Sequence, residues 1–226
     1  MMVATQRTDE HFKDKHAAIL EMIKTKTIGT VFFGDSLIRR WEDNPTVWHN
    51  LYHRWAAVNF GVGGDTLENM KWRLLNGELE NISPKVLLFL GGTNNLPTQS
   101  ADTVSKGIIE LILLIKNRLP DTNILLLALL PRRGDGEHGP YDDKIERVNQ
   151  TLKEWSVAHH VTYLDVGKHL ATADGLLNAD YTDDGLHLNS AGYEAVGPFL
   201  AEAIEELYRD SEEDRGYLDA RTQDQR

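Results

Sequence analysis

The stretch KVLLFLGGTNN at residues 85–95 consists of a lysine, an uninterrupted apolar run and a polar turn with two glycines. A strand that is apolar at every position is buried on both faces, which is typical of a parallel sheet covered by helices on each side. Such runs recur roughly every 25 to 40 residues, the spacing of strand–helix–strand crossovers. We predict five strands, at Thr30–Phe33, Ala57–Asn59, Lys85–Leu90, Asn123–Leu130 and Val161–Leu164.

Helical periodicity fills the segments around these strands. Apolar residues at steps of three and four predict helices at Leu67–Leu79, Val104–Leu119 and Tyr141–Ala158. A helix around Ala17–Ile23 would cover the sheet before the first strand, and Ala191–Tyr208 would form the last helix. The predicted fold is therefore an α/β protein, a three-layer α/β/α sandwich with a five-stranded parallel sheet.

The chain length fits one domain. At about 150 residues per domain, 226 residues correspond to one α/β domain with additional segments. We place a single domain with an N-terminal covering helix at residues 1–208. Residues 209–226 contain six acidic residues and four arginines but few apolar ones, so we expect a disordered tail.

Composition excludes several classes of protein. The chain has no cysteine, which rules out disulfide frameworks, thiolate zinc sites, iron–sulfur clusters and cysteine nucleophiles. Its formal net charge of −11 argues against non-specific nucleic-acid binding. The first ten residues lack the apolar segment of a signal peptide, and the run Ile124–Leu130 is far shorter than a membrane span. We expect a cytoplasmic protein without stable membrane insertion.

Polar turns follow the ends of four predicted strands. In open parallel sheets, ligands bind beyond the carboxyl ends of the strands. The turns there are Gly34–Leu37, Phe60–Thr66, Gly91–Asn95 and, at some distance after the fifth strand, Asp183–His187. Four polar turns with glycines at one sheet edge predict a binding or catalytic site.

The residue types in these turns suit nucleophilic catalysis. Ser36 lies where a strand-to-helix turn could lift its hydroxyl into a cleft, although a serine there can equally cap a helix. His187 follows Asp184 by three residues, so a carboxylate could orient its imidazole as a general base; the alternative is an incidental histidine in a surface turn. Gly64 and Asn94 could stabilise an oxyanion through N–H groups, or simply shape a turn and cap a helix.

Other motifs are incomplete. The GVG at residues 61–63 is not completed to a dinucleotide-binding fingerprint, because Thr66 stands where the third glycine is needed. No P-loop and no GxSxG elbow occurs. His49 and His53 are one helical turn apart, but without HExxH or an obvious third ligand we interpret them as a helix face rather than a zinc site.

Together the four turns resemble the ordered sequence blocks of SGNH (GDSL-type) hydrolases. The blocks are GDSL at residues 34–37, the glycine turn at Gly64, GTNN at residues 92–95 and DxxH at residues 184–187. The stretches NFGVGGDT (59–66), LLPR (129–132) and GLHLNSAGY (185–193) look like the catalytic α subunits of platelet-activating-factor acetylhydrolase isoform Ib. The resemblance implies the flavodoxin-like SGNH hydrolase fold and no metal or organic cofactor.

The resemblance also implies roles for individual residues. Ser36 would be the nucleophile, His187 the base and then the acid, and Asp184, rather than its neighbour Asp183, the orienting carboxylate. The oxyanion hole would consist of the N–H groups of Ser36 and Gly64 and the amide of Asn94. The positions that line a small acyl pocket in the acetylhydrolases match Leu37, Thr93 and Leu186.

The expected function is hydrolysis of short-chain, acetyl-type esters by a serine esterase. Asn95 stands where many family members carry an aspartate, which favours the acetylhydrolase branch over the thioesterase branch. The alternatives are a carbohydrate O-acetyl esterase and a non-catalytic scaffold of the same fold. The expected partners are a small acylated lipid or sugar and, from the resembled subfamily, a second copy in a homodimer.

Overall fold

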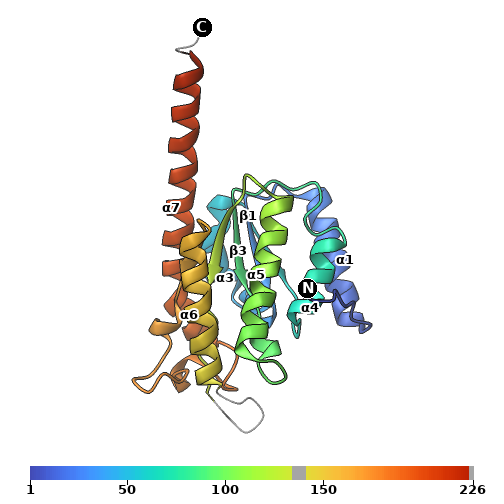
Figure 1. Ribbon diagram of the computed structural model, residues 1–226, viewed down its shortest axis with the longest axis vertical. Coiled ribbons are helices and arrows are strands. Elements are labelled where there is room, and N and C mark those ends of the chain that lie inside the picture. The colour runs from blue at the N-terminus through green and yellow to red at the C-terminus, as the bar shows by residue number, and fades with distance from the viewer. Residues whose placement is uncertain (134–140, 224–226) are drawn as a thin grey trace.

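The computed structural model describes residues 1–133 and 141–223. Its centre is one parallel five-stranded sheet in the order β2-β1-β3-β4-β5 (Figure 1). The strands are β1 (Thr30–Gly34), β2 (Ala57–Gly61), β3 (Val86–Leu90), β4 (Asn123–Leu127) and β5 (Thr162–Leu164). Each pairs in parallel with its neighbours. The predicted α/β class and the five parallel strands are confirmed.

Helices cover both faces of the sheet. One layer contains α1 (Glu10–Thr25), α4 (Leu67–Leu75), α5 (Ala101–Arg118) and α6 (Asp142–Ala158). The other contains α2 (Ser36–Arg39), α3 (Pro45–Tyr52) and α7 (Ser190–Gln223). Short 3-10 turns lie at Arg40–Asp43, His53–Trp55, Thr93–Asn95, Gly167–His169 and Ala179–Tyr181.

The strands divide their side chains between two cores. Phe33, Leu87 and Phe89 face the layer of α1, α4, α5 and α6. Phe32 and Leu88 face the layer of α3 and α7. This alternation explains why the strand sequences are apolar throughout, since neither face meets water.

Two glycines allow α2 to pack directly on the sheet. A Cβ atom at Gly61 would lie 2.2 Å from the backbone nitrogen of Arg39, and one at Gly34 would lie 2.6 Å from Cγ1 of Ile38 in α2. Asn59 completes this contact, because its side chain donates to the carbonyl oxygen of Ile38 at 2.8 Å. The helix that begins at the nucleophile candidate is thereby held against the end of β2.

Several boundaries differ from the predicted ones. β4 ends at Leu127, where its pairing with β5 ends, rather than at Leu130. α4 ends at Leu75 rather than at residue 79, because Gly77 adopts a positive φ of 105° that a helix does not allow. α2 was not predicted, and α3 was anticipated only as the helix face of His49 and His53, whose rings stack 4.5 Å apart.

The last helix runs past residue 208, where the sequence predicts the domain to end, and the disordered tail stays a prediction. α7 continues from the globular part through Gln223 and extends beyond the other elements (Figure 1). The domain division at residue 208 stays a prediction.

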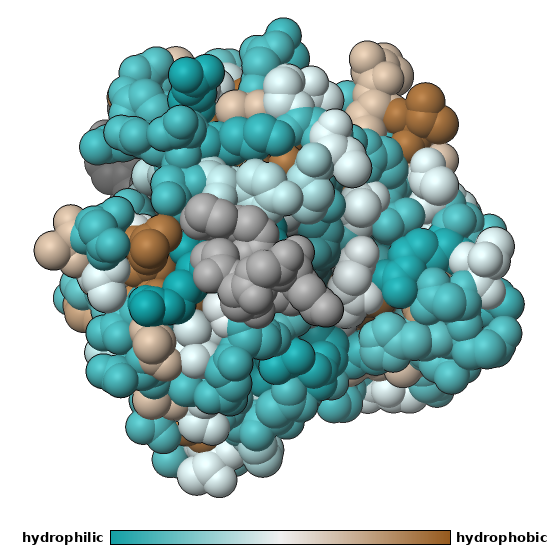
Figure 2. All heavy atoms as spheres, turned by 90° about the horizontal axis from the view of Figure 1, so that it is seen from below, coloured by the Kyte–Doolittle hydropathy of each residue, from teal (hydrophilic) through white to brown (hydrophobic). Residues whose placement is uncertain are grey.

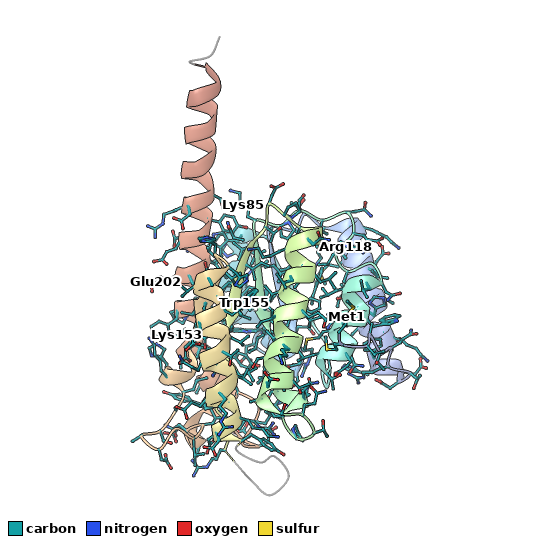
Figure 3. All side chains as sticks on the ribbon, in the orientation of Figure 1. Met1, Lys85, Arg118, Lys153, Trp155 and Glu202 are labelled. Atoms are coloured by element: carbon teal, nitrogen blue, oxygen red, sulfur yellow. The ribbon has the colours of Figure 1, made fainter. Side chains whose placement is uncertain are left out.

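The N-terminal segment before α1 is bound to the helical layer. The Thr5 backbone N–H donates to the carbonyl oxygen of Glu68 at 3.0 Å, and the Asn69 side chain donates to the carbonyl oxygen of Thr5 at 2.9 Å. The Met2 N–H donates to the Glu110 carboxylate at 2.9 Å, and Met1 lies beside α4 and α5 (Figure 3). Among the helices of residues 1–133 and 141–223, none has the length and apolar character to span a bilayer.

Candidate active site

The predicted site residues gather at the carboxyl edge of the sheet. Ser36 begins α2 directly after β1, while Gly64 follows β2 and Asn94 follows β3. The chain from β1 crosses to one neighbouring strand and then returns to the other side, so this edge is a topological switch point, where α/β sheets bind ligands. Figure 2 looks onto this edge, and hydrophilic residues cover most of the visible surface.

Ser36, His187 and Asp184 form a continuous hydrogen-bonded chain. His187 Nε2 lies 2.9 Å from Ser36 Oγ, and His187 Nδ1 lies 2.6 Å from Asp184 Oδ2. The other Asp184 oxygen accepts the backbone N–H groups of Leu186 and His187, at 3.0 and 2.7 Å. The carboxylate is therefore fixed by the same turn that carries the imidazole.

The charge state of Asp184 determines which nitrogen of His187 carries the proton. Partial burial acts to raise the pKa of this carboxyl, but the hydrogen bonds from the His187 ring and from the two backbone N–H groups outweigh it and bring the pKa to about 2. Ionised Asp184 can only accept, so Nδ1 is the donor in that contact. In the neutral ring Nε2 is then an acceptor for the Ser36 hydroxyl proton.

Gly64 and Asn94 are the two other residues predicted to stabilise an oxyanion. Gly64 has a φ of 80°, a backbone conformation that glycine adopts without strain. Asn94 donates one amide N–H to the carbonyl oxygen of Asp65 at 2.8 Å, which orients its side chain. An amide has two N–H donors, and the second makes no hydrogen bond to any described residue. The oxyanion-hole roles of Ser36, Gly64 and Asn94 remain proposals.

A buried arginine joins the first two turns, and no motif in the sequence indicated it. Arg73 is fully buried on α4. It donates to the carbonyl oxygens of Gly34, at the end of β1, and of Phe60, in β2. Its charge is balanced by Asp65 and Glu78, each at 2.8 Å and also buried. Two strand ends that carry site residues are thus fixed by one guanidinium group.

The third turn has its own supports. Arg132 is buried and donates to the carbonyl oxygen of Thr93 at 3.2 Å, while its guanidinium lies over the Tyr141 ring. Asn95 is buried, accepts the Leu67 N–H at 3.0 Å and donates to Glu68 at 2.9 Å. Asn95 therefore connects this turn to the start of α4 instead of facing the reacting group.

The predicted acyl-pocket residues are buried around the same site. Leu37, Thr93 and Leu186 each adjoin a triad or oxyanion residue in the sequence, and each is nearly inaccessible to solvent. The Thr93 hydroxyl has no hydrogen-bond partner among the described residues. The acyl pocket that these residues would line remains a proposal.

Asp35, next to the nucleophile candidate, should make stability depend on pH. Burial raises the pKa of Asp35 to about 7, aided by the nearby Asp65 charge and opposed by the Leu37 N–H and Arg73. The folded protein therefore keeps this proton up to about pH 7, whereas the unfolded chain releases it near 3.8. The contribution of Asp35 to the free energy of unfolding therefore falls as the pH rises from 3.8 to about 7.

We expect Asp35→Asn to remove this loss, because asparagine can still accept the Leu37 N–H without becoming charged. Urea unfolding at pH 5 and pH 8 should show a stability difference between the two pH values that is about 2–3 kcal/mol smaller in Asp35→Asn than in the wild type. Asp14→Asn, which changes an exposed carboxylate on α1, is the control. An identical pH dependence in Asp35→Asn and the wild type would contradict the prediction.

Comparison with known proteins agrees with this architecture. Residues 32–195 match the model of the GDSL-like Lipase/Acylhydrolase family. The chain is 35% identical over 209 residues to platelet-activating factor acetylhydrolase IB subunit alpha2 of Rattus norvegicus and of Homo sapiens, covering 92% of this chain and 89% of each relative. Among solved structures, a putative acylhydrolase from Bacteroides fragilis superposes with a TM-score of 0.74 at 20% identity, over 88% of this chain and 99% of the other. A carbohydrate acetylesterase from Sinorhizobium meliloti superposes with a TM-score of 0.66 at 16% identity, over 80% of this chain and 100% of the other.

The family match includes the Ser36, Gly64, Asn94 and His187 turns and the sheet apart from the first two residues of β1. The relatives extend the similarity over most of both chains at a level of identity that shows common descent. The chain belongs to the GDSL-like lipase/acylhydrolase family and is a carboxylic ester hydrolase.

Proposed function

We propose that this protein is a serine esterase that hydrolyses short-chain, acetyl-type esters through an acyl-enzyme intermediate. The observation that carries the proposal is the hydrogen-bonded chain from Ser36 Oγ through the His187 ring to Asp184. A scaffold protein has no need of a serine, an imidazole and an ionised carboxylate in this order. The alternative of a non-catalytic protein is therefore disfavoured.

The proposed reaction proceeds in two halves. Ser36 Oγ attacks the ester carbonyl carbon while its proton passes to His187 Nε2, and the carbonyl oxygen becomes an oxyanion. When the carbon–oxygen bond to the leaving alcohol breaks, His187 returns the proton to that alcohol and the acyl group stays on Ser36. A water molecule then repeats the sequence and releases the acid. Asp184 stays ionised throughout and stabilises the imidazolium that forms in each half.

Stabilisation of the oxyanion is assigned to backbone and amide N–H groups. The N–H groups of Ser36 and Gly64 and the Asn94 amide lie at the ends of β1, β2 and β3, which pair side by side in the sheet. Preorganised donors of this kind act most strongly where charge develops. No step of this mechanism requires a metal or an organic cofactor.

The acetyl preference rests on Leu37, Thr93 and Leu186. Their burial supports a closed acyl pocket, and the curated relatives are named as acetylhydrolases of platelet-activating factor. Forcing extra methylene groups into packed surroundings costs typically 1–3 kcal/mol. We therefore propose that the acyl group is short. A substrate screen would identify the alcohol part of the ester, as a lipid or a sugar.

Two chromogenic esters test this proposal. We expect kcat/KM for p-nitrophenyl acetate to exceed that for p-nitrophenyl octanoate by about tenfold or more, because the octanoyl chain cannot enter the pocket without displacing buried side chains. Equal or faster turnover of the octanoate would overturn the small acyl pocket while leaving the esterase intact. Failure to hydrolyse either ester would overturn the esterase proposal itself.

A further inference from the structure

Arg7, in the segment before α1, contacts the glycine turn of the site. Its Nη1 donates to the carbonyl oxygen of Gly63 at 2.6 Å and to Asp65 Oδ1 at 2.9 Å. The other guanidinium nitrogens contact Asp9, whose side chain also caps the start of α1. The Arg7 side chain is about three-quarters buried, with 23% of its surface exposed. This geometry fixes the guanidinium group against the turn.

The Gly63 carbonyl and the Gly64 N–H belong to one peptide group. In a trans peptide the C=O and N–H point in opposite directions, and no described peptide bond is cis. A hydrogen bond that holds the carbonyl on the outer side therefore sets the direction of the N–H on the other side. This peptide adjoins the nucleophile turn, since a Cβ atom on Gly63 would lie 4.0 Å from Ser36 Cβ.

A peptide between two glycines needs such support. Glycine has the widest choice of backbone conformations, so this peptide could rotate more easily than any other in the turn. A charge-assisted hydrogen bond is about twice as strong as a neutral one. It also polarises the peptide, which makes the N–H on the opposite side a better donor. Arg7 can thus both orient and strengthen the Gly64 donor.

We propose that Arg7 is a positioning residue for the oxyanion hole. Through this residue the N-terminal segment, which lies outside the family match at residues 32–195, takes part in catalysis. The inference rests on the proposed function, in which the Gly64 N–H stabilises the oxyanion. Arg7 and Arg73 both contact the side chain of Asp65 in this turn, Arg7 through one carboxylate oxygen and Arg73 through the other.

If Arg7 had a purely structural role, it would hold the N-terminal segment against the rest of the protein. That segment has other attachments, through Met2 to Glu110, through Thr5 to Glu68 and through Asn69 to Thr5. Loss of Arg7 should therefore leave the segment in place while the glycine peptide loses its orientation. The two roles consequently predict different kinetic results.

The test uses full-length protein with p-nitrophenyl acetate. We expect Arg7→Met to lower kcat by about tenfold with KM changed less than twofold, because the oxyanion forms only after binding. Arg7→Lys should recover part of kcat, and guanidinium ion should raise kcat of Arg7→Ala but not of the wild type. Asn94→Ala provides the scale for complete loss of a donor, a reduction on the order of 10²–10³.

Arg54→Met is the matched control. Arg54 forms an exposed ion pair with Glu205 at 2.7 Å and lies over the Trp55 ring, away from the turn, so kcat should be unchanged. The proposal is overturned if Arg7→Met matches the control, if only KM changes, or if the loss follows a lower unfolding midpoint without rescue by lysine or guanidinium. An inactive wild type would instead overturn the proposed function, so the two failures are distinguishable.

Discussion

Replacing Ser36 with alanine should lower kcat for p-nitrophenyl acetate by about four orders of magnitude or more, because the variant has no nucleophile to form the acyl-enzyme. The hydroxyl contacts His187 Nε2, and Asp35 still caps α2 through the Leu37 N–H. The fold should therefore be unaffected. Steady-state hydrolysis, together with the urea unfolding midpoint, measures both expectations.

The Ser83→Ala variant serves as the control, since Ser83 is exposed before β3 and should leave kcat unchanged. A stronger check uses an organophosphonate that reacts with serine nucleophiles. Mass spectrometry should find one adduct on the wild type and none on Ser36→Ala. Substantial turnover by folded Ser36→Ala, or an adduct on another residue, would show that Ser36 is not the nucleophile.

The second large effect concerns stability. Arg73→Met should lower the free energy of unfolding by about 3–5 kcal/mol, because methionine leaves the buried carboxylates of Asp65 and Glu78 without their shared cation. The loss should be smaller at pH 5 than at pH 8, since unpaired buried carboxyl groups can take up protons as the pH falls. Urea unfolding at the two pH values measures both differences.

A double variant separates loss of charge balance from loss of packing. Arg73→Met/Glu78→Gln should be more stable than Arg73→Met alone at pH 8, because it removes one of the two buried carboxylates that lose their Arg73 partner. A free energy of unfolding in Arg73→Met equal to that of the wild type would mean that Arg73 does not stabilise the strand ends. Equal stability of the single and double variants would point to packing rather than charge.

The sheet could be predicted from sequence because its strands are apolar on both faces. Residues such as Phe32 and Phe33 point to opposite cores, so the strand pattern is visible without tertiary information. The predicted positions of the strand ends were less accurate. The apolar run after Leu127 continues to Leu130 and is buried, but it leaves the sheet because β5 offers no further partner.

The gathering of Ser36, Asp184 and His187 was anticipated from turns at strand ends and from family motifs, whereas the supporting arginines were not. Arg73 looks like an ordinary polar residue on an amphipathic helix, and its burial depends on Asp65 and Glu78 folding around it. Arg7 precedes every motif of the family. The homodimer and the cytoplasmic location stay predictions.

The contact of α2 with β2 has a consequence for redesign of the enzyme. Since Gly61 meets the backbone of Arg39 with no side chain in between, the distance between the nucleophile turn and the second turn is set by main-chain atoms. A side chain at Gly61 would push these turns apart, and one at Gly34 would collide with the Leu90 carbonyl at the end of β3. Libraries that aim to accept bulkier acyl groups should therefore keep both glycines invariant and vary the proposed acyl-pocket residues Leu37, Thr93 and Leu186 instead.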